Sequence, residues 1–584
     1  MLNGLLPNPP AGVKISFYAD DVTLWISSHT LQICIEQLQA ALNLVAGWSG
    51  EWGLRFSPTK TKVLLMSQSG ASRSNRVRHT PITLKLYGNV IPVVKSHKYL
   101  GVYFDNHLTW KPHIDYLTNT LVNKVNILKA ISGREWGADR TSMLMLYKHM
   151  IRPKIEYGCI LYASASETNL KRLDSIQNQC IKIATGAFKS SRTKDVEVEA
   201  NIPSLRLHYH LVILRTVAPI VASPSHPVRM LVDDFSRYIH LSHPPFSTRA
   251  HLLARKYNVP FDWIEPVPHI NTEQWATKAN IIHLNSDLSK ADCTVALLQD
   301  ALSIINNYPD HEPYYTDGSK MESRTGAGIH SASLSRGFRL PNDYSVFDAE
   351  LFAIFAAIEH ILQEEKSAIL FSDSRSSLEA IKNCSHKHPL VLKICKLILT
   401  SPISIYLAWI PSHIGIPGNE RADDWAKRSL NYRDMDITPS PISYSTLMRM
   451  TKSKIQLYWQ NEWSRRGYLT YKQDIGPTLT AARPRRCEEV ALCRLRMGKT
   501  MLTHITPWMC GTFPDNCEHC GDRLTIKHIL VDCVHFIRQR RDIAQHFNTA
   551  QTPNLSIYSL LKDDKVVIDL LIKYLWATGL ISKL

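Results

Sequence analysis

The stretch from Pro313 to Leu430 decides the fold of the most readable part of the chain. It begins Pro313-Tyr-Tyr-Thr-Asp317-Gly318-Ser319-Lys, continues with Asp348-Ala-Glu350-Leu-Phe-Ala-Ile and Leu370-Phe-Ser-Asp373-Ser-Arg, and ends Trp409-Ile-Pro-Ser-His413-Ile-Gly-Ile-Pro-Gly-Asn419-Glu-Arg-Ala-Asp423. Runs typical of strands alternate here with runs typical of helices, which predicts a sheet flanked by helices.

Four acids in this stretch are expected at strand ends or helix starts. Asp317 closes a strand before a Gly-Ser turn, and Asp373 follows the strand that begins at Ala368. Glu350 lies in the first turns of an apolar helix running to about Gln363, and Asp423 lies in a helix that starts near Asn419. Such ends meet at one edge of an α/β sheet, so the four acids can converge there. Converging carboxylates repel one another, which favours two bound Mg²⁺ that activate water and stabilise the leaving oxygen of a phosphodiester.

The order and spacing of these residues resemble type 1 ribonuclease H. The resemblance implies that Asp317, Glu350, Asp373 and Asp423 bind the two Mg²⁺, and that His413 assists proton transfer or product release. It also implies nucleic-acid contacts for Gly318 and Ser319, and for Asn419 either such a contact or support of the site. Asp423 is preferred to the adjacent Asp424 because it stands ten residues after His413, as in the family. His386, Lys387 and His388 fall where some relatives carry a basic protrusion, but we expect a solvated turn.

A second motif lies near the N-terminus. Tyr18-Ala-Asp20-Asp21 separates two β-rich runs, which predicts a hairpin, and a helix is expected from about Leu31 to Trp48. With Gly53-Leu-Arg-Phe and Lys98-Tyr-Leu-Gly, the motif resembles the palm of non-LTR retrotransposon polymerases, which implies that Asp20 and Asp21 are metal ligands. Residues 1–19 contain no Asp or Glu, and a polymerase needs a further palm aspartate. We therefore expect an incomplete polymerase, either a remnant or a fragment of a longer chain.

A third motif lies near the C-terminus. Cys517, Cys520, His528 and Cys533 have the spacing of four ligands for one tetrahedral, structural Zn²⁺. Cys510, His519 or His535 could replace one of them, and free cysteines in a core are the alternative. Together with the upstream Leu495-Arg-Met-Gly, the pattern resembles the tail that follows the nuclease in jockey-like elements.

These motifs predict a multidomain chain of the α/β and α+β classes. The expected parts are a truncated palm (1–110), a helical thumb-like region (111–200), a linker (201–310), a ribonuclease H domain with a mixed sheet (311–432), a basic aromatic helical linker (433–504), a zinc-binding tail (505–545) and a C-terminal helical segment (546–584). Trp459 and Trp463 near Arg465 could stack on single-stranded nucleic acid or pack inside a helix interface. In the thumb-like region, Leu117, Leu121, Val125 and Leu128 recur at helical spacing, as do Leu144, Tyr147 and Ile151.

Composition agrees with a nucleic-acid partner. The 584 residues include 68 Lys and Arg against 51 Asp and Glu, a net charge of +17 that favours polyanions. The twelve cysteines show no disulfide framework, which predicts a reducing, intracellular compartment, with cytoplasm and nucleus not distinguished. No apolar run is long enough to span a membrane, so no membrane partner is expected.

The sequence is therefore interpreted as the C-terminal part of a non-LTR retrotransposon polyprotein. The expected reaction is hydrolysis of the RNA strand of an RNA–DNA hybrid, with the ribose 2′-hydroxyl distinguishing the strands. Two alternatives stay open: a catalytically inactive remnant that binds nucleic acid, and an RNA-directed DNA polymerase that works only within a longer chain. The sequence leaves the oligomeric state and the RNA target open.

Overall fold

The structure is a computed structural model divided into two compact units, Met1–Leu205 with Gly467–Leu584 (unit 1) and Arg206–Arg466 (unit 2). It describes residues 8–66, 81–233, 238–240, 244–261, 264, 266, 270–278, 281–283, 294–322, 324–383, 388–431, 437–438, 442–465, 471–472, 474–505, 516–549 and 555–584. No helix in these ranges is long and apolar enough to cross a membrane.

Unit 2 is built on a six-stranded mixed sheet with the order β12-β11-β10-β13-β14-β9. The strands are β9 (Ile282–His283), β10 (Glu312–Met321), β11 (Arg324–His330), β12 (Ser335–Leu340), β13 (Ala368–Ser372) and β14 (Ile405–Trp409). β10, β11 and β12 are antiparallel neighbours, whereas β13 runs parallel to β10. Thr316 is paired with Ser372, so Asp317 in β10 and Asp373 just after β13 follow neighbouring positions of the sheet.

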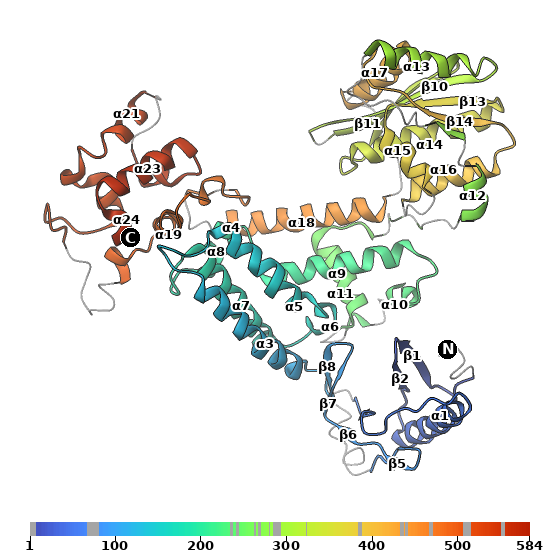
Figure 1. Ribbon diagram of the computed structural model, residues 1–584, viewed down its shortest axis with the longest axis horizontal. Helices are drawn as coiled ribbons and strands as arrows, with labels where there is room; N and C mark the ends of the chain where they lie inside the picture. Colours follow the sequence, from blue (N-terminus) through green and yellow to red (C-terminus); the bar gives the residue numbers. More distant parts are fainter. Residues whose placement is uncertain are drawn as a thin grey trace. The chain divides into compact units, whose positions relative to one another are not determined.

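Helices cover both faces of this sheet (Figure 1), which makes the fold the predicted α/β class. One face carries α14 (Val346–Glu364), α15 (Arg375–Lys382) and α16 (Pro389–Thr400), and the other carries α13 (Thr294–Asn306) and α17 (Pro417–Asn431). α14 begins at a capping box in which the Ser345 and Asp348 side chains each bond the other's main-chain N–H. Its buried stripe of Leu351, Ile354 and Ile358 then packs into the core.

A close approach places α17 on the sheet. A Cβ added to Gly328 on β11 would lie 2.1 Å from the Ala422 carbonyl oxygen of α17, so only glycine allows this spacing. Because Asp423 follows Ala422, the same approach brings Asp423 to the sheet.

Part of the segment 201–310 belongs to this sheet. β9 pairs with β14 through Leu407 and Ile282, and Ala301 of α13 packs in one cluster with Ile369 and Phe371 of β13. The other helices that begin between residues 205 and 466 are α9 (Leu205–Ala222), α10 (Arg229–Asp233), α11 (Phe246–Tyr257), α12 (Thr272–Lys278) and α18 (Tyr444–Ser464).

Unit 1 begins with the hairpin that the sequence predicted. β1 (Lys14–Tyr18) and β2 (Asp21–Trp25) are antiparallel, and α1 (Leu31–Glu51) follows. The short strands β3 (Val63–Leu64), β4 (Lys85–Leu86), β5 (Asn89–Val90), β6 (Val93–Val94), β7 (Ser96–Tyr99) and β8 (Val102–Asp105) come next.

Helices form the rest of the first segment of unit 1. They are α3 (Lys111–Ala130), α4 (Arg140–Leu146), the π-helical turn η3 (Tyr147–Ile151), α5 (Arg152–Glu156), α6 (Cys159–Tyr162), α7 (Glu167–Thr185) and α8 (Thr193–Ala200). The predicted α3 stripe, Leu117 to Leu128, is buried. In the second predicted stripe Tyr147 and Ile151 are buried, whereas Leu144 of α4 is half-buried and its neighbour Met143 is buried.

The second segment of unit 1 consists of short helices. They are η7 (Leu479–Ala481), α19 (Arg486–Arg496), η8 (Met501–Ile505), η9 (His528–Asp532), η10 (Val534–Phe536), α21 (Arg541–Thr549), α22 (Ile557–Leu561), α23 (Lys565–Ala577) and α24 (Leu580–Lys583).

A buried carboxylate joins the two segments of unit 1. Glu199, at the end of α8, is ion-paired with Arg140 of α4 at 2.8 Å and with Arg496 of α19 at 3.5 Å. Tyr471 donates a hydrogen bond to Glu199 Oε2 at 3.2 Å, and Lys472 Nζ donates to the Val198 carbonyl at 3.0 Å. Residues 471–496 are therefore held against helices that lie almost 300 positions earlier in the sequence.

Two glutamates of α8 have opposite electrostatic environments. Burial raises the pKa of Glu199, but Arg496 and Arg140 outweigh burial and lower that pKa to about 2. Burial raises the pKa of Glu197 from 4.5 to about 8, with a further increase from Asp174. Glu199 is therefore charged at neutral pH in the folded protein, whereas Glu197 is protonated.

We predict that Glu199→Gln destabilises unit 1 by roughly 3–5 kcal/mol, because Arg140 and Arg496 lose the anion that neutralises their buried charges. Hydrogen exchange of α8 and α19 peptides at pH 7, followed by mass spectrometry, measures this. The stabilisation from Glu199 should fade as pH falls from 4.5 towards 2.

Glu197→Gln is the matched control. It should leave exchange at pH 4 nearly unchanged and slow it at pH 8, because the raised pKa of Glu197 lowers stability as pH rises from 4.5 to 8. Equal destabilisation by both substitutions would contradict the assignment of Glu199 as the anion.

Candidate functional site

Three acids meet where β13 ends beside the middle of β10. The expectation that Asp317 closes a strand before a Gly-Ser turn is wrong, because β10 continues through Gly318 and Ser319 to Met321, paired with β11. Asp317, Glu350 and Asp373 each offer a carboxylate oxygen, and these oxygens lie within 4.8 Å of one another. Asp317 comes from β10, Asp373 follows β13, and Glu350 comes from the second turn of α14. Asp317 and Glu350 are buried, so water screens their charges poorly.

Their pKa values reflect this crowding. Burial raises the pKa of Asp317 to about 7, and the carboxylates of Asp373 and Asp423 contribute to the increase. Burial also raises the pKa of Glu350 well above its ordinary range, with Asp317 and Asp373 adding to the effect. A cation bound among these groups would remove the repulsion and favour the ionised forms.

The donor set fits a hard divalent cation. Glu350 Oε2 is buried and has no hydrogen-bond partner among the described residues, so one strong acceptor is available to a ligand. Mg²⁺ takes oxygen ligands, and one or two carboxylates commonly hold it. A Cβ added to Gly318 would lie 2.6 Å from the Glu350 main-chain nitrogen, so the missing side chain lets α14 approach β10.

Asp423 and His413 lie in an adjacent group. Atoms of His413, Glu420 and Asp423 are within 4.8 Å of one another, and the contribution of Asp423 to the pKa of Asp317 relates the two groups. Asp423 Oδ2 accepts a hydrogen bond from Lys427 at 2.6 Å. Asp424 instead pairs with Arg428, and its side chain is 51% exposed, so the structure favours Asp423 as the acid facing the site.

The remaining residues predicted for this site differ in accessibility. His413 is exposed, on the loop after β14, with a φ of 55°. Ser319 is half-buried, whereas Gly318 is buried. Asn419 is also buried, and its Oδ1 has no partner among the described residues, which favours support of the site over direct contact with nucleic acid.

The expected solvated turn at residues 386–388 is wrong for His388. His388 is buried, and its Nε2 lies 3.1 Å from Asp348 Oδ1, because it precedes α16 and packs against the start of α14. His386 and Lys387 lie outside the described residues.

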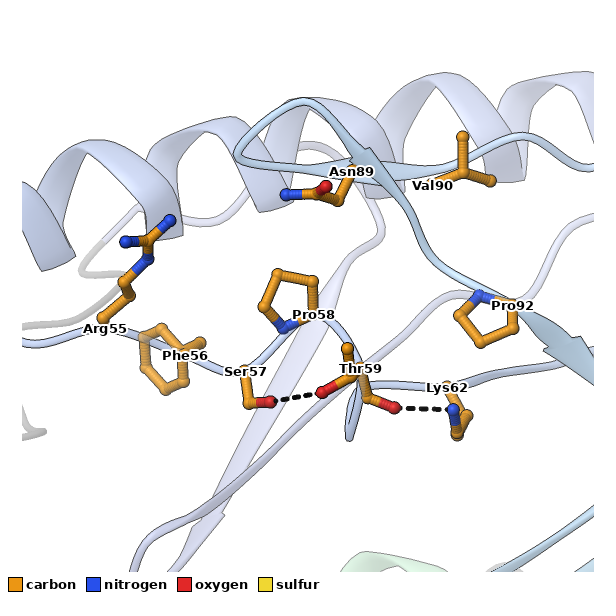
Figure 2. Close-up of a pocket in the computed structure, with 9 residues that line it drawn as sticks. All are labelled: Arg55, Phe56, Ser57, Pro58, Thr59, Lys62, Asn89, Val90 and Pro92. Atoms are coloured by element: carbon orange, nitrogen blue, oxygen red, sulfur yellow. Dashed lines mark hydrogen bonds between the residues drawn. The ribbon is translucent and has the colours of Figure 1, made fainter.

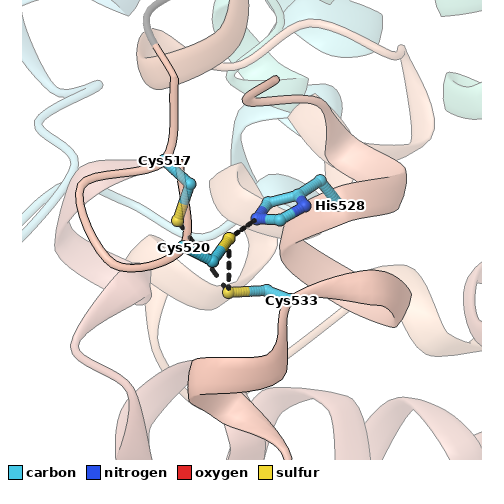
Figure 3. Close-up of side chains that lie close together, drawn as sticks. All are labelled: Cys517, Cys520, His528 and Cys533. Carbon is cyan, nitrogen blue, oxygen red and sulfur yellow. Dashed lines mark hydrogen bonds between the residues drawn. The ribbon is translucent and has the colours of Figure 1, made fainter. Parts of the chain in front are cut away.

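Four predicted ligands meet in the C-terminal segment. In Figure 3, Cys517 and Cys520 come from one turn, and His528 and Cys533 from the helical turn that follows. Cys533 Sγ lies 3.8 Å from Cys517 Sγ and 4.0 Å from Cys520 Sγ, and Cys520 Sγ lies 3.2 Å from His528 Nε2. Two sulfurs bound at 2.3 Å to a tetrahedral Zn²⁺ are about 3.8 Å apart, whereas a disulfide is far shorter.

Local backbone geometry aims these ligands. Gly521 has a φ of 76° and donates to the Cys517 carbonyl at 2.9 Å, which closes the turn between the first two cysteines. Burial raises the pKa of Cys517, but hydrogen bonds from the His519 main chain and the His528 side chain contribute to lowering it to about 6. A thiolate is the form that binds metal.

The alternative ligands are placed elsewhere. His519 and His535 stack on each other with ring centroids 3.8 Å apart, and both contact Phe536. Neither belongs to the four-residue group. Cys510 lies outside the described residues.

The polymerase-like motif has a different setting. Asp20 and Asp21 are exposed at the β1–β2 turn, and among the described residues neither belongs to a group of three possible metal ligands. The second polymerase-like segment, which begins at Gly53, contributes residues between 55 and 62 to a groove of about 780 Å³. Asn89, Val90 and Pro92 also line this groove (Figure 2). Its Lys62 Nζ donates to the Thr59 carbonyl at 2.7 Å, which ties this cation to its own turn.

Comparison with known proteins agrees with this geometry. Residues 310–431 match the RNase H family model. The chain is 25% identical over 196 residues to the RNA-directed DNA polymerase from mobile element jockey of Drosophila funebris, which covers 33% of this chain and 20% of that protein. It is 26% identical over 178 residues to the probable RNA-directed DNA polymerase from transposon BS of Drosophila melanogaster, which covers 30% of this chain and 19% of that protein. It is 27% identical over 158 residues to the retrovirus-related Pol polyprotein from type-1 retrotransposable element R1 of Bradysia coprophila, which covers 27% of this chain and 15% of that protein.

Residues 310–431 therefore form a ribonuclease H domain. Relatives of the chain include RNA-directed DNA polymerases and Pol polyproteins of jockey-like and R1 non-LTR retrotransposons, so the resemblance to ribonuclease H and the link to non-LTR retrotransposon polyproteins are confirmed. The matched region spans about a fifth of the length of the jockey protein.

Two features of the site were not anticipated from the sequence. Glu420 lies with His413 and Asp423, and its spacing of one helical turn before Asp423 was the available signal. Asp348 is buried among donors from two other segments, His388 and helix α18, and its place two residues before Glu350 gave no indication of those partners.

We predict that Asp373→Asn stabilises unit 2 when EDTA removes divalent cations, because it relieves repulsion with Asp317 and Glu350. The gain should be about 1 kcal/mol, measured as slower hydrogen exchange in β10, β13 and α14. Asp424→Asn, which changes an exposed acid, should give no gain. A less stable Asp373→Asn protein in EDTA would argue against electrostatic crowding at this edge.

Proposed function

We propose that the domain hydrolyses the RNA strand of an RNA–DNA hybrid, using Asp317, Glu350, Asp373 and Asp423 to hold two Mg²⁺. The observation that carries the proposal is the meeting of Asp317, Glu350 and Asp373 oxygens within 4.8 Å on a ribonuclease H sheet. The unpartnered Oε2 of Glu350 supports it further.

The side chains have separate roles in this proposal. Bound Mg²⁺ would activate a water and stabilise the leaving oxygen of the phosphodiester. Asp317 and Asp373 are set by neighbouring parallel strands, so their spacing is fixed by the sheet register. Glu350 would close the cluster from α14, and His413, on an exposed loop near Asp423, would accept or donate a proton at its imidazole.

Strand choice would follow from contacts with the sugar. Only RNA carries a 2′-hydroxyl, which can both donate and accept a hydrogen bond. Ser319, half-buried next to the acids, has the hydroxyl that is suited to such a contact, and the Gly318 main chain adjoins it. The net charge of +17 favours binding of the hybrid backbone.

The purified chain with Mg²⁺ should cut the RNA of a labelled hybrid and leave duplex DNA intact. Asp373→Asn should slow cutting by at least roughly a hundredfold, because an amide cannot neutralise the cations. Denaturing gel electrophoresis of the cleaved RNA measures both rates.

Asp424→Asn should cut at the parental rate, because Asp424 faces solvent beside Arg428. If Asp373→Asn cuts as fast as the parent, the acid cluster is not the site of hydrolysis. A parent that binds the hybrid and does not cut it would instead support the alternative of an inactive nucleic-acid-binding protein.

We also propose that Cys517, Cys520, His528 and Cys533 hold one structural Zn²⁺. Sulfur separations near 3.8 Å fit the edges of a tetrahedral shell, and four protein ligands leave no position for a reacting water. Metal binding would stabilise a segment whose helices are short, since metal affinity and folding are coupled.

Elemental analysis of protein purified under reducing conditions should find one zinc per chain. Cys520→Ser should lose it and become protease-sensitive between residues 516 and 536, while RNA cleavage on a short hybrid persists. Nucleic-acid binding should weaken most at low salt, where contacts with phosphates contribute most. Ser582→Cys, which leaves the four ligands intact, is the control for adding or removing a thiol. Zinc-free protein, or an unchanged digestion pattern for Cys520→Ser, would contradict the zinc site and support the alternative that these are free cysteines in a core.

A further inference from the structure

Helix α18, which lies after the matched residues 310–431, contacts the first turn of α14. Thr446 Oγ1 lies 3.0 Å from Asp348 Oδ1 and 3.1 Å from Oδ2, and Arg449 donates to Oδ2 at 3.0 Å. Asp348 is only two residues before Glu350. The contact therefore links α18 to the segment that carries one of the clustered acids.

Asp348 is a buried anion with a full set of donors. Besides Thr446 and Arg449, the Ser345 N–H and hydroxyl donate to its Oδ2 at 2.8 and 2.5 Å, and His388 Nε2 lies 3.1 Å from Oδ1. Burial alone raises the pKa of Asp348, but the hydrogen bonds from His388 and Ser345 outweigh it and hold the pKa well below its usual range. A buried carboxylate is stable only with such partners, so each donor restricts where it can lie.

The following turn of α14 is also fixed. The Glu350 main chain lies so close to β10 that any Cβ on Gly318 would clash with it at 2.6 Å. The Gly318 main chain hydrogen-bonds the Glu350 carboxylate, whereas Glu350 Oε2 has no partner among the described residues. The place of the carboxylate therefore depends on how α14 lies against β10, and the α14 backbone is held between β10 and the Asp348 cluster.

Several contacts fix α18 in turn. Ser443 caps it by accepting a hydrogen bond from the Thr446 N–H at 3.1 Å. The preceding segment forms single bridges from Ile437 to Arg339 and from Ile442 to Ile264. Arg449 also donates to the Asp343 carbonyl at 3.2 Å, which holds the loop before α14.

We propose that Thr446 and Arg449 are positioning residues for Glu350, acting through Asp348, so that the working nuclease extends through α18. The inference rests on the proposed function for the role of Glu350. Neither residue touches the substrate or the cations in this account. They restrict the first turn of α14, and through it the geometry of metal binding.

The test is Mn²⁺ binding to the full-length chain without nucleic acid, followed by electron paramagnetic resonance. Arg449→Met and Thr446→Val should each weaken Mn²⁺ binding by about tenfold, the scale found when a group that orients a metal ligand is removed. Arg449→Lys, which keeps the charge, should recover part of the loss. Lys452→Met, which removes an exposed cation from the same helix, should bind Mn²⁺ as the parent does.

Cleavage assays provide an independent readout. In Arg449→Met, the Mg²⁺ concentration for half-maximal rate should rise while the KM for the hybrid stays unchanged, which a defect in substrate binding would not produce. Parental Mn²⁺ affinity in both Arg449→Met and Thr446→Val, or equal weakening in Lys452→Met, would overturn the proposal. Because Mn²⁺ binding is measured without hybrid, absence of cleavage by the parent would count against the proposed function alone.

Discussion

The structure of unit 2 depends on holding three carboxylates together against their mutual repulsion. Asp317, Glu350 and Asp373 converge on the sheet, where burial raises the free energy of the charged forms of Asp317 and Glu350. A flexible chain would separate them. The parallel pairing of β10 with β13 and the tight contact of α14 with Gly318 prevent this, and the crowding becomes an arrangement that a divalent cation can stabilise.

Asp348 is also a buried carboxylate, but it is stabilised by hydrogen-bond donors of the protein. Asp348 is as deeply buried as Glu350, but it is surrounded by donors from Ser345, His388, Thr446 and Arg449. Its charge is therefore satisfied by the protein, whereas Glu350 Oε2 has no partner among the described residues. Two acids two residues apart on one helix thus have different environments, because one is surrounded by donors and the other lies among carboxylates.

Unit 1 also contains a buried carboxylate that the protein itself neutralises, with partners from two segments far apart in the sequence. Glu199 is neutralised by Arg140 from the first segment and Arg496 from the second. A buried ion pair contributes modestly to net stability, but loss of one partner leaves an uncompensated charge and is strongly unfavourable. The pairing therefore selects one arrangement of the two segments, which flank the whole of unit 2 in the sequence.

The sequence by itself determined the features that depend on local spacing. The strand ending before Asp373, the helix carrying Glu350, the β1–β2 hairpin and the Cys517-to-Cys533 spacing all follow from patterns within a few tens of residues. The tertiary structure alone decided which distant segments meet. β9 joins the sheet beside β14, α18 reaches Asp348, and Arg496 reaches Glu199. Hydrophobic periodicity and charge show that a residue needs a partner, but not which one, because that choice depends on packing across long separations in the chain.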